Sequence, residues 1–171
     1  MIIGMVIEFV RLNLISCADI VRLHNDQQVL RHLPLAGEKF DIATSRKWIE
    51  SKEQQWREHG IGPLAIQIDG QFAGWGGFQM ELGNADLALV LFPVYWGKGV
   101  VICRMFIRKA FEEYNLESIT ALLPVSRTKT KGMQRLGFKP EGAVDIEGHQ
   151  FIRYRLLKKD TRPHAIDEGD M

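Results

Sequence analysis

Two glycines on either side of a lysine, Gly97 and Gly99, have the spacing that points most directly to chemistry. An apolar run, residues 87–92, precedes them, and residues 100–114 follow with apolar side chains at helical spacing. A glycine turn between a strand and a helix leaves the first N–H groups of the helix unpaired, and no Cβ blocks the approach of a ligand. An anionic group, and in particular a diphosphate, is the ligand that such a turn is expected to bind.

Two other phosphate-binding motifs do not match these glycines. A dinucleotide-binding fingerprint would need a third glycine where Ile102 stands, and a Walker loop would need Ser or Thr where Gly99 follows Lys98. A turn in which glycine serves backbone geometry alone remains open, because such turns are commoner than anion sites. The glycine spacing by itself therefore does not decide between a plain turn and a ligand site.

The wider loop, Pro-Val-Tyr-Trp-Gly-Lys-Gly at residues 93–99, resembles the acetyl-CoA pyrophosphate loop of the GNAT N-acetyltransferases. It has the form found in the branch that includes the ribosomal-protein N-terminal acetyltransferases. Further segments resemble this branch in the same order along the chain: residues 48–50, 56–60, 72–77 and 135–138. The resemblance implies acetylation of a primary amine by direct attack in a ternary complex, with acetyl-CoA as cosubstrate and no metal.

The resemblance also assigns cofactor contacts to this stretch. They fall on the central strand, the loop and the start of the helix: Leu89, Val90, Leu91, Trp96, Gly97, Lys98, Gly99, Val100, Val101 and Ile102. A main-chain N–H near residues 89–91 is implied as the donor to the oxyanion, so that side-chain identity there is not critical. Val101 departs from the family pattern, which has a small residue at this position.

Transfer to an amine needs a route for the amine's proton, because lysine and α-amino groups are largely protonated at neutral pH. Asp86 is the first candidate base, since it opens the central strand where this branch often has an acid and could accept a proton through water. Glu81 is the second candidate and His149 the third. The alternative for Asp86 is turn chemistry beside Asn84.

The segment after the next strand departs from the branch pattern Pro-x-Asn-x-x-Ser, because Ser126 and Lys129 replace its asparagine and its serine. Arg127, Lys129 and Lys131 also place three cations at the start of a helix, where the helix dipole disfavours them. We expect Ser126 to contact the cofactor in place of the family's asparagine. We expect one or more of the three cations, Arg127 among them, to reach the 3′-phosphate or diphosphate of CoA, and Lys129 also to stabilise the leaving thiolate. A solvated basic surface is the alternative.

Length and composition indicate a single domain. At 171 residues, with 46% hydrophobic and 25% charged residues, the chain is long enough for a substantial core. We expect an acetyltransferase domain at 1–158 and a polar C-terminal tail at 159–171. The net charge of +1 predicts no nucleic-acid partner, and the lack of a sufficiently long apolar run predicts no membrane span. A homodimer is compatible with these features.

The two cysteines, Cys17 and Cys103, stand singly, without the paired spacing of a zinc site or a disulfide framework. We expect them to fill the core of a protein of the reducing cytoplasm. No Cys/His or Ser/His/Asp arrangement is evident, so covalent catalysis is not expected.

The expected fold is of the α/β (α+β) class, a mixed, mostly antiparallel sheet of about seven strands with four or so helices. The resemblance adds central strands splayed over a cofactor cleft. Asp69-Gly70 and Glu147-Gly148 predict hairpin turns, Ser16 a helix start, and residues 126–135 the last helix. Glycines within residues 72–80 indicate a bulge or the close approach of a ligand or another backbone.

A helix that begins at Asp41 or Thr44 is expected to end at Gly60. Its expected seam consists of Ile42, Ile49 and Trp56. Trp48 lies off that seam and either covers the rim of the core or walls a substrate pocket. His24 is expected to be a half-buried or surface residue and not a catalyst.

A second class of function stays open, namely a degenerate member that binds CoA or an acyl-CoA as a sensor or partner module without turnover. The acceptor also stays open among protein N-termini, polyamines, aminoglycosides and small amino compounds. Acceptor pockets in this fold are built from variable loops, and for that reason the sequence does not name the acceptor.

Overall fold

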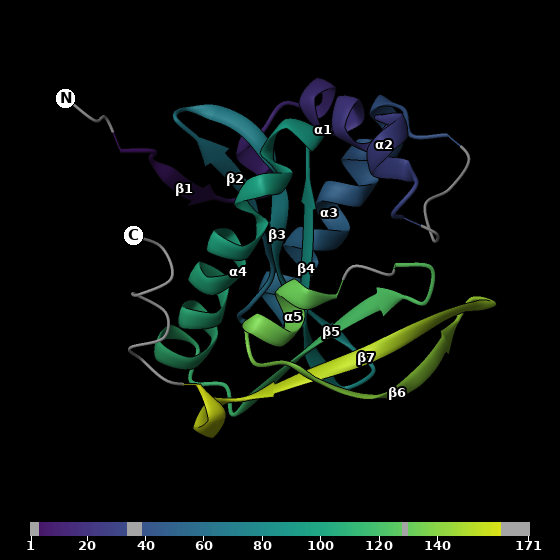
Figure 1. The fold of residues 1–171 in the computed structure, drawn as a ribbon. Coiled ribbons are helices and arrows are strands. Elements are labelled where there is room, and N and C mark those ends of the chain that lie inside the picture. The colour runs from purple at the N-terminus through teal and green to yellow at the C-terminus, as the bar shows by residue number, and fades with distance from the viewer. Residues whose placement is uncertain (1–3, 34–38, 128–129, 162–171) are drawn as a thin grey trace. The chain divides into compact units, whose positions relative to one another are not determined.

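A computed structural model describes residues 4–33, 39–127 and 130–161 of the chain (Figure 1). The strands form one sheet in the order β1-β2-β3-β4-β5-β7-β6, which confirms the predicted mixed, mostly antiparallel fold class. They are β1 (Ile7–Val10), β2 (Pro63–Ile68), β3 (Gln71–Glu81), β4 (Asn84–Leu91), β5 (Ser118–Pro124), β6 (Lys139–Ile146) and β7 (His149–Leu157). The α-helices within the described ranges are α1 (Cys17–His24), α2 (Gln27–Leu30), α3 (Ile42–His59), α4 (Gly99–Arg108) and α5 (Lys131–Arg135).

The chain divides into two compact units, one built from residues 1–79 and 88–96 and the other from residues 80–87 and 97–171. The first unit contains β1, β2 and helices α1 to α3, and the second contains α4, α5 and strands β5 to β7. Strands β3 and β4 contribute residues to both. The boundary expected between a domain at 1–158 and a tail at 159–171 stays a prediction.

Local capping chemistry sets the helix ends of the first unit, as predicted. The Ser16 hydroxyl accepts a backbone N–H bond from the first turn of α1, and the Asp41 carboxylate accepts one from Thr44 at the start of α3. α3 ends at Gly60, whose φ of 71° is left-handed. Asp69-Gly70 has positive φ at both residues and joins β2 to β3 in the predicted hairpin.

Helix α3 buries different side chains from the predicted seam. Ile42 is 39% exposed, and Ile49 and Trp56 are half-buried, whereas Ser45 and Glu53 are buried. The Ser45 hydroxyl donates to the Ile42 carbonyl, and the Glu53 carboxylate is ion-paired. Apolar spacing cannot reveal buried polar groups of this kind, because their burial depends on hydrogen-bond partners and not on hydrophobicity.

Strand β3 contains a glycine that the fold requires. Gly74 has a φ of 152°, and a Cβ at this position would come within 2.1 Å of the Val90 carbonyl oxygen and 2.8 Å of the Leu91 Cα. The pairing of β2 with β3 is irregular at the neighbouring position, between Ile66 and Gln67. The predicted close approach of another backbone is confirmed, and that backbone belongs to β4.

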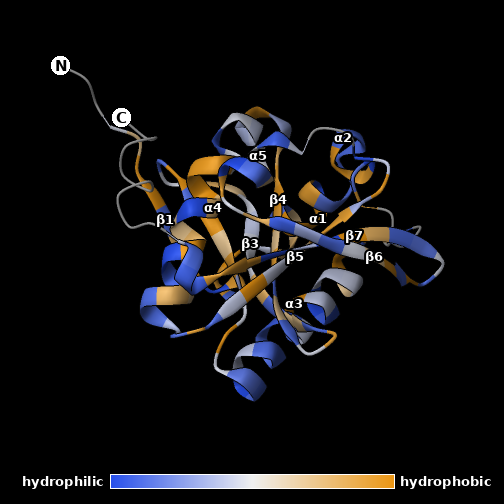
Figure 2. Ribbon diagram, turned by 60° about the horizontal axis from the view of Figure 1, so that its bottom comes forward, coloured by the Kyte–Doolittle hydropathy of each residue, from blue (hydrophilic) through white to orange (hydrophobic). Residues whose placement is uncertain are grey.

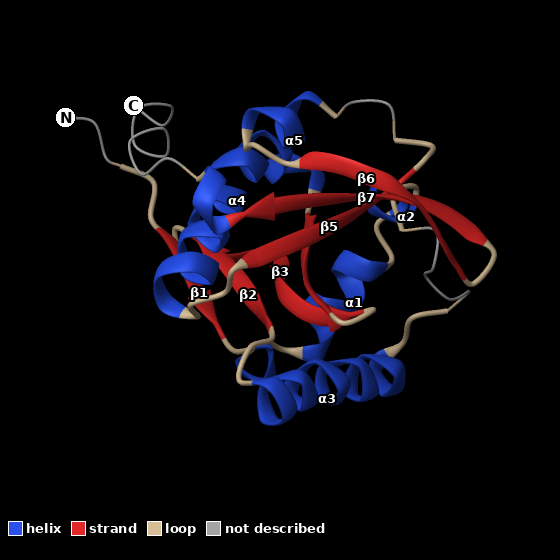
Figure 3. Cartoon of the chain, turned by 90° about the horizontal axis from the view of Figure 1, so that it is seen from below, coloured by secondary structure: helices blue, strands red, loops and turns tan. Residues whose placement is uncertain are grey.

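The second unit is built on strands β5, β7 and β6, which pair antiparallel in that order. Figure 3 shows these three strands side by side, with α4 and α5 on one side of them. Glu147-Gly148, with φ values of 50° and 80°, forms the predicted turn between β6 and β7. β4 joins β5 in parallel, with Asp86 opposite Thr120.

Helix α4 is the apolar helix of this unit, and Figure 2 shows hydrophobic residues along it, whereas α3 is mainly hydrophilic. Ile102, Phe106 and Ile107 are buried. Arg104 is also buried, at 9% exposure. Arg104 lies three residues before Ile107, and side chains three apart share a helix face.

The last helix is shorter than predicted. Helix α5 spans Lys131–Arg135, whereas Ser126 lies in a turn that follows β5. The Arg127 N–H donates to the Pro124 carbonyl at 2.9 Å, which closes a turn and not a helix at this point. The three cations expected at one helix start therefore do not share it, because Arg127 precedes α5 and Lys131 opens it.

Candidate functional site

The glycine loop forms a 3-10 turn, Pro93–Lys98, that runs directly into α4. Lys98 precedes the first helical residue and supplies no side-chain cap, so the first N–H groups of α4 have no capping partner from that residue. Gly97 is exposed, and a Cβ built there would meet nothing within 4 Å. The turn thus presents open main chain at a helix start, which is the geometry that favours an anion.

The first part of this loop is fastened to the strand that precedes it. The Tyr95 N–H donates to the Phe92 carbonyl at 2.9 Å, and the Phe92 N–H donates to the Ala73 carbonyl of β3 at 3.0 Å. The indole Nε1 of Trp96 donates to the Leu91 carbonyl at 2.9 Å. The loop therefore starts from a fixed position at the end of β4.

Burial separates two groups among the predicted cofactor contacts. The side chains of Val90, Leu91 and Ile102 are buried in the core, so only their main chain could serve a ligand. The others are half-buried or exposed: Leu89, Trp96, Gly97, Lys98, Gly99, Val100 and Val101. Their role as cofactor contacts stays a prediction.

Asp86 is buried in the second unit, with 6% of its surface exposed. The Thr120 hydroxyl donates to its Oδ1 at 2.9 Å. Burial raises the pKa of Asp86 to about 6; the Thr120 hydrogen bond opposes this rise, Glu81 adds to it, and Arg153 opposes it. A carboxyl group with a pKa near neutrality can both take up and release a proton at physiological pH, as a general base must.

The other candidates for catalysis lie in three different settings. Glu81 is half-buried at the end of β3, and its charge acts on Asp86. His149 is exposed where β7 begins. Lys129 lies outside the described residues. Ser126 and Arg127 are exposed in the turn after β5, so the structure leaves both accessible to a ligand.

Sequence analysis did not identify the groups that surround Asp86. Thr120 is 34 residues away in the chain, and Arg153 lies on β7. Arg155, two residues further along β7, donates to three acceptors: Glu141 Oε2 at 2.8 Å, Ser118 Oγ at 2.9 Å and Asn84 Oδ1 at 3.0 Å. This fork fixes the start of β4 two residues before Asp86, and no local sequence signal marks it.

Cys103 is unsuited to nucleophilic catalysis. Burial raises the pKa of its thiol to about 12, although the charge of Arg127 opposes the rise. A thiol with such a pKa holds almost no thiolate at neutral pH. This supports direct transfer over a covalent intermediate at Cys103.

His24 lies in an aromatic cluster and not at the surface. It is buried, its Nδ1 lies 3.0 Å from the Ile20 carbonyl, and its Nε2 accepts from the Trp75 indole at 3.3 Å. Its ring stacks on Phe40 at 4.3 Å and meets Trp48 edge-on at 4.7 Å. Burial lowers the pKa of His24, so the neutral form prevails. Trp48 also packs against the hydrophobic core of the first unit, which agrees with a place at its rim.

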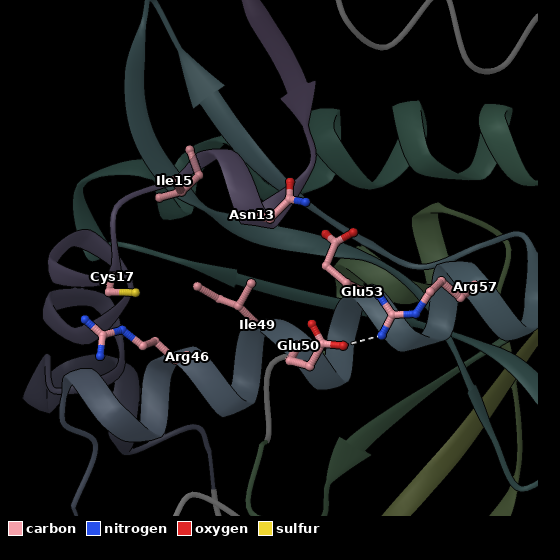
Figure 4. Close-up of a pocket in the computed structure, with 8 residues that line it drawn as sticks. All are labelled: Asn13, Ile15, Cys17, Arg46, Ile49, Glu50, Glu53 and Arg57. Carbon is pink, nitrogen blue, oxygen red and sulfur yellow. Dashed lines mark hydrogen bonds and ion pairs between the residues drawn. The ribbon is translucent and has the colours of Figure 1, made fainter.

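A separate depression of about 260 Å³ lies on the first unit (Figure 4). It is lined by Asn13, Ile15, Cys17, Arg46, Ile49, Glu50, Glu53 and Arg57. Glu50 and Arg57 form an ion pair there, and Glu53 is bound by Arg11. None of the predicted site residues lines it, so this depression is not a candidate for the acetyl-transfer site.

Within the described ranges, no three His, Cys, Asp or Glu side chains gather into a metal site. No helix of the described part of the chain is long and apolar enough to cross a membrane.

Residues 10–139 match the family model of the acetyltransferase (GNAT) domain. The chain belongs to the GNAT acetyltransferase family. The fold expected from the resemblance is confirmed for this GNAT protein, and the cofactor role of its glycine loop stays a prediction. The finer assignment to the branch of the ribosomal-protein N-terminal acetyltransferases stays a prediction.

Solved structures of acetyltransferases share the fold of this GNAT protein. The microcin C7 self-immunity acetyltransferase MccE, solved in complex with acetyl-CoA and AMP, is 19% identical with a TM-score of 0.72, over 88% of this chain and 92% of that one. Spermidine N-acetyltransferase from Vibrio cholerae, in complex with CoA and spermine, is 14% identical with a TM-score of 0.70, over 91% and 96%. A GNAT-family acetyltransferase from Bacillus anthracis is 17% identical with a TM-score of 0.69, over 91% and 95%.

Proposed function

We propose that this GNAT protein transfers the acetyl group of acetyl-CoA to a primary amine by direct attack in a ternary complex. The observation that carries the proposal is Asp86, a buried carboxyl group whose pKa lies near neutrality in a family built for acyl transfer. A group with these properties serves a step in which a proton must leave the nucleophile.

In this mechanism the amine nitrogen attacks the thioester carbonyl, and its proton passes to Asp86 directly or through water. The C–S bond then breaks, and the CoA thiolate leaves and takes up a proton from water, while Asp86 returns its proton to solvent. Main-chain N–H groups near residues 89–91 are proposed to stabilise the oxyanion. The open main chain of Gly97 to Ile102 is proposed to hold the diphosphate.

The acceptor is proposed only as a primary amine. One structural relative, spermidine N-acetyltransferase, was solved with spermine, and another, MccE, was solved with AMP. Their sequence identity to this chain is too low to assign either compound as its acceptor. The branch resemblance adds protein N-termini to the candidates. Cys17 and Cys103 are both unpaired, which supports the reducing cytoplasm as the proposed compartment.

The proposal is tested by the release of CoA thiol from acetyl-CoA with a panel of amines: peptides with free N-termini, polyamines, aminoglycosides and amino acids. We expect release with at least one class, and loss of that release in Asp86→Asn but not in Asp145→Asn, which alters an exposed carboxylate on β6. Calorimetry with CoA runs in parallel. Binding of CoA without thiol release from any amine would favour the alternative, a CoA-binding module without turnover.

A further inference from the structure

Trp96 lies where the glycine loop passes into helix α4, and the residue is 44% exposed. Its indole N–H donates to the Leu91 carbonyl, so that the side chain spans the loop and returns to the strand from which the loop departs. Exposure of this extent means that burial stabilises the position only in part. The indole N–H supplies a hydrogen bond that a phenylalanine at this position could not make.

His32 contacts the same indole from another part of the chain. The two rings meet edge-on, with centroids 5.5 Å apart and an interplanar angle of 73°. His32 follows helix α2, and its N–H donates to the Val29 carbonyl at 3.0 Å. Val29 is 3% exposed in the core of the first unit, so the imidazole is presented from a fixed framework.

We propose that Trp96 is a positioning residue that fastens the cofactor loop to the end of β4, and that His32 holds the indole in the orientation that makes this bond. The inference rests on the proposed function, because it assigns the loop to the cofactor diphosphate. It goes further by making the loop preformed before the cofactor arrives. A loop that is already ordered loses less conformational freedom on binding, and affinity rises accordingly.

The bond also has a consequence for the end of β4. Leu91 is the last residue of β4, and its carbonyl accepts the Trp96 indole N–H. The same bond joins Trp96 to Leu91, which belongs to the strand segment, residues 89–91, whose N–H groups are proposed to face the thioester carbonyl. Loss of the bond should therefore lower the affinity for CoA more than it changes the KM for the amine acceptor.

Trp96→Phe removes the indole N–H and keeps an aromatic ring. Trp56→Phe is its matched control, because the Trp56 indole also donates to a backbone carbonyl, that of Pro63, at 2.9 Å. We expect Trp96→Phe to weaken CoA in calorimetry about fivefold, the effect of one neutral hydrogen bond. Trp56→Phe should leave CoA affinity unchanged even where it lowers thermal stability.

His32→Ala tests the second half of the inference without any ligand. By NMR, the solvent exchange of the Trp96 indole N–H should become about two- to fivefold faster in this variant, while the indole of Trp56 keeps its rate. His32→Phe, which restores an aromatic edge, should return the rate toward the parent value. An unchanged exchange rate in His32→Ala, or equal CoA affinity in Trp96→Phe and the parent, would overturn the inference. A parent protein that does not bind CoA would instead overturn the proposed function, and the exchange measurement would still decide the role of His32.

Discussion

The Thr120 hydroxyl donates to Oδ1 of Asp86 at 2.9 Å, across the parallel pair of strands β4 and β5. This bond favours the ionised carboxylate, whereas burial favours the neutral acid. Burial has the larger effect, and for that reason the pKa of Asp86 rises to about 6 instead of falling. Thr120 therefore keeps Asp86 closer to the ionised form than its burial alone would allow.

Replacement of Asp86 by asparagine should remove the base and leave the size and shape of the side chain nearly unchanged. The parent rate should rise through the pKa of Asp86, near 6, whereas the variant should lack this inflection. At neutral pH the rate should fall by a factor of about 10² to 10⁴, and the loss should shrink at high pH, where the amine loses its proton unaided. The measurement is kcat/KM between pH 5 and 10. An unchanged profile would remove Asp86 from the mechanism.

Replacement of Thr120 by valine removes the hydroxyl and keeps the branched shape. Because the lost bond favours the ionised carboxylate, the pKa of Asp86 should rise further and the inflection of the rate profile should move to higher pH. Thr120→Ser, which keeps a hydroxyl, should leave the inflection near its parental position. If the valine variant lowers the rate without moving the inflection, Thr120 contributes to packing alone.

The raised pKa of Asp86 also predicts how stability depends on pH. A folded-state pKa above the ordinary value means that the protonated acid favours the fold; this contribution is complete below pH 3.8 and is lost as pH rises through about 6. A rise from 3.8 to about 6 corresponds to about 3 kcal/mol. Asp86→Asn should therefore gain stability over the parent by up to this amount between pH 4 and pH 8.

Urea denaturation at both pH values measures this gain. Asp145→Asn is the control, because Asp145 is exposed on β6 and its carboxylate keeps its hydration. A constant difference between Asp86→Asn and the parent at the two pH values would contradict the pKa. The combination of higher stability and lower activity in one variant is expected where a buried charge serves catalysis.

Features that depend on a few neighbouring residues could be predicted from the sequence. The turns at Asp69-Gly70 and Glu147-Gly148 and the caps Ser16 and Asp41 rest on local backbone preferences, and all four are confirmed. The glycine loop belongs to the same class, because its strand, turn and helix are contiguous. Similar segments in the same order along most of the chain indicated the family, and the family model matches residues 10–139.

Features that depend on distant partners could not be predicted. The burial of Glu53 requires Arg11, 42 residues away, and the environment of Asp86 requires Thr120 and Arg153. The sequence indicates Asp86 by its place in the strand, whereas its raised pKa arises from tertiary burial. A residue pattern identifies which groups could react, and the packed structure decides which of them has a shifted pKa.

Gly97 offers a test of the loop that separates folding from binding. A Cβ there meets nothing, and the backbone is not left-handed, so Gly97→Ala should fold with unchanged or slightly higher stability. The added methyl should nevertheless occupy space that the diphosphate needs, and it should weaken CoA. Gly97→Asp should weaken CoA about tenfold more than Gly97→Asn, because only the aspartate repels the phosphates. Equal affinities in calorimetry for all three variants would place the diphosphate elsewhere.

Arg127 tests the basic segment after β5. It is exposed and precedes α5, so the stability of that helix gives it no evident purpose. We expect it to bind the 3′-phosphate of CoA together with Lys129. Arg127→Ala should then weaken acetyl-CoA about fivefold and acetyl-dephospho-CoA much less, and added salt should reduce this preference.

Arg135→Ala, which removes an exposed arginine from the other end of α5, is the matched control and should leave both cofactors unaffected. Lys129→Ser separates two roles for its position: loss of acetyl-CoA affinity would assign it to the phosphate, and loss of turnover at constant affinity would assign it to the thiolate. At low salt the Coulomb attraction of these cations for the phosphate is screened least. Equal affinity for both cofactors in Arg127→Ala and the parent under those conditions would reduce the segment to a solvated surface.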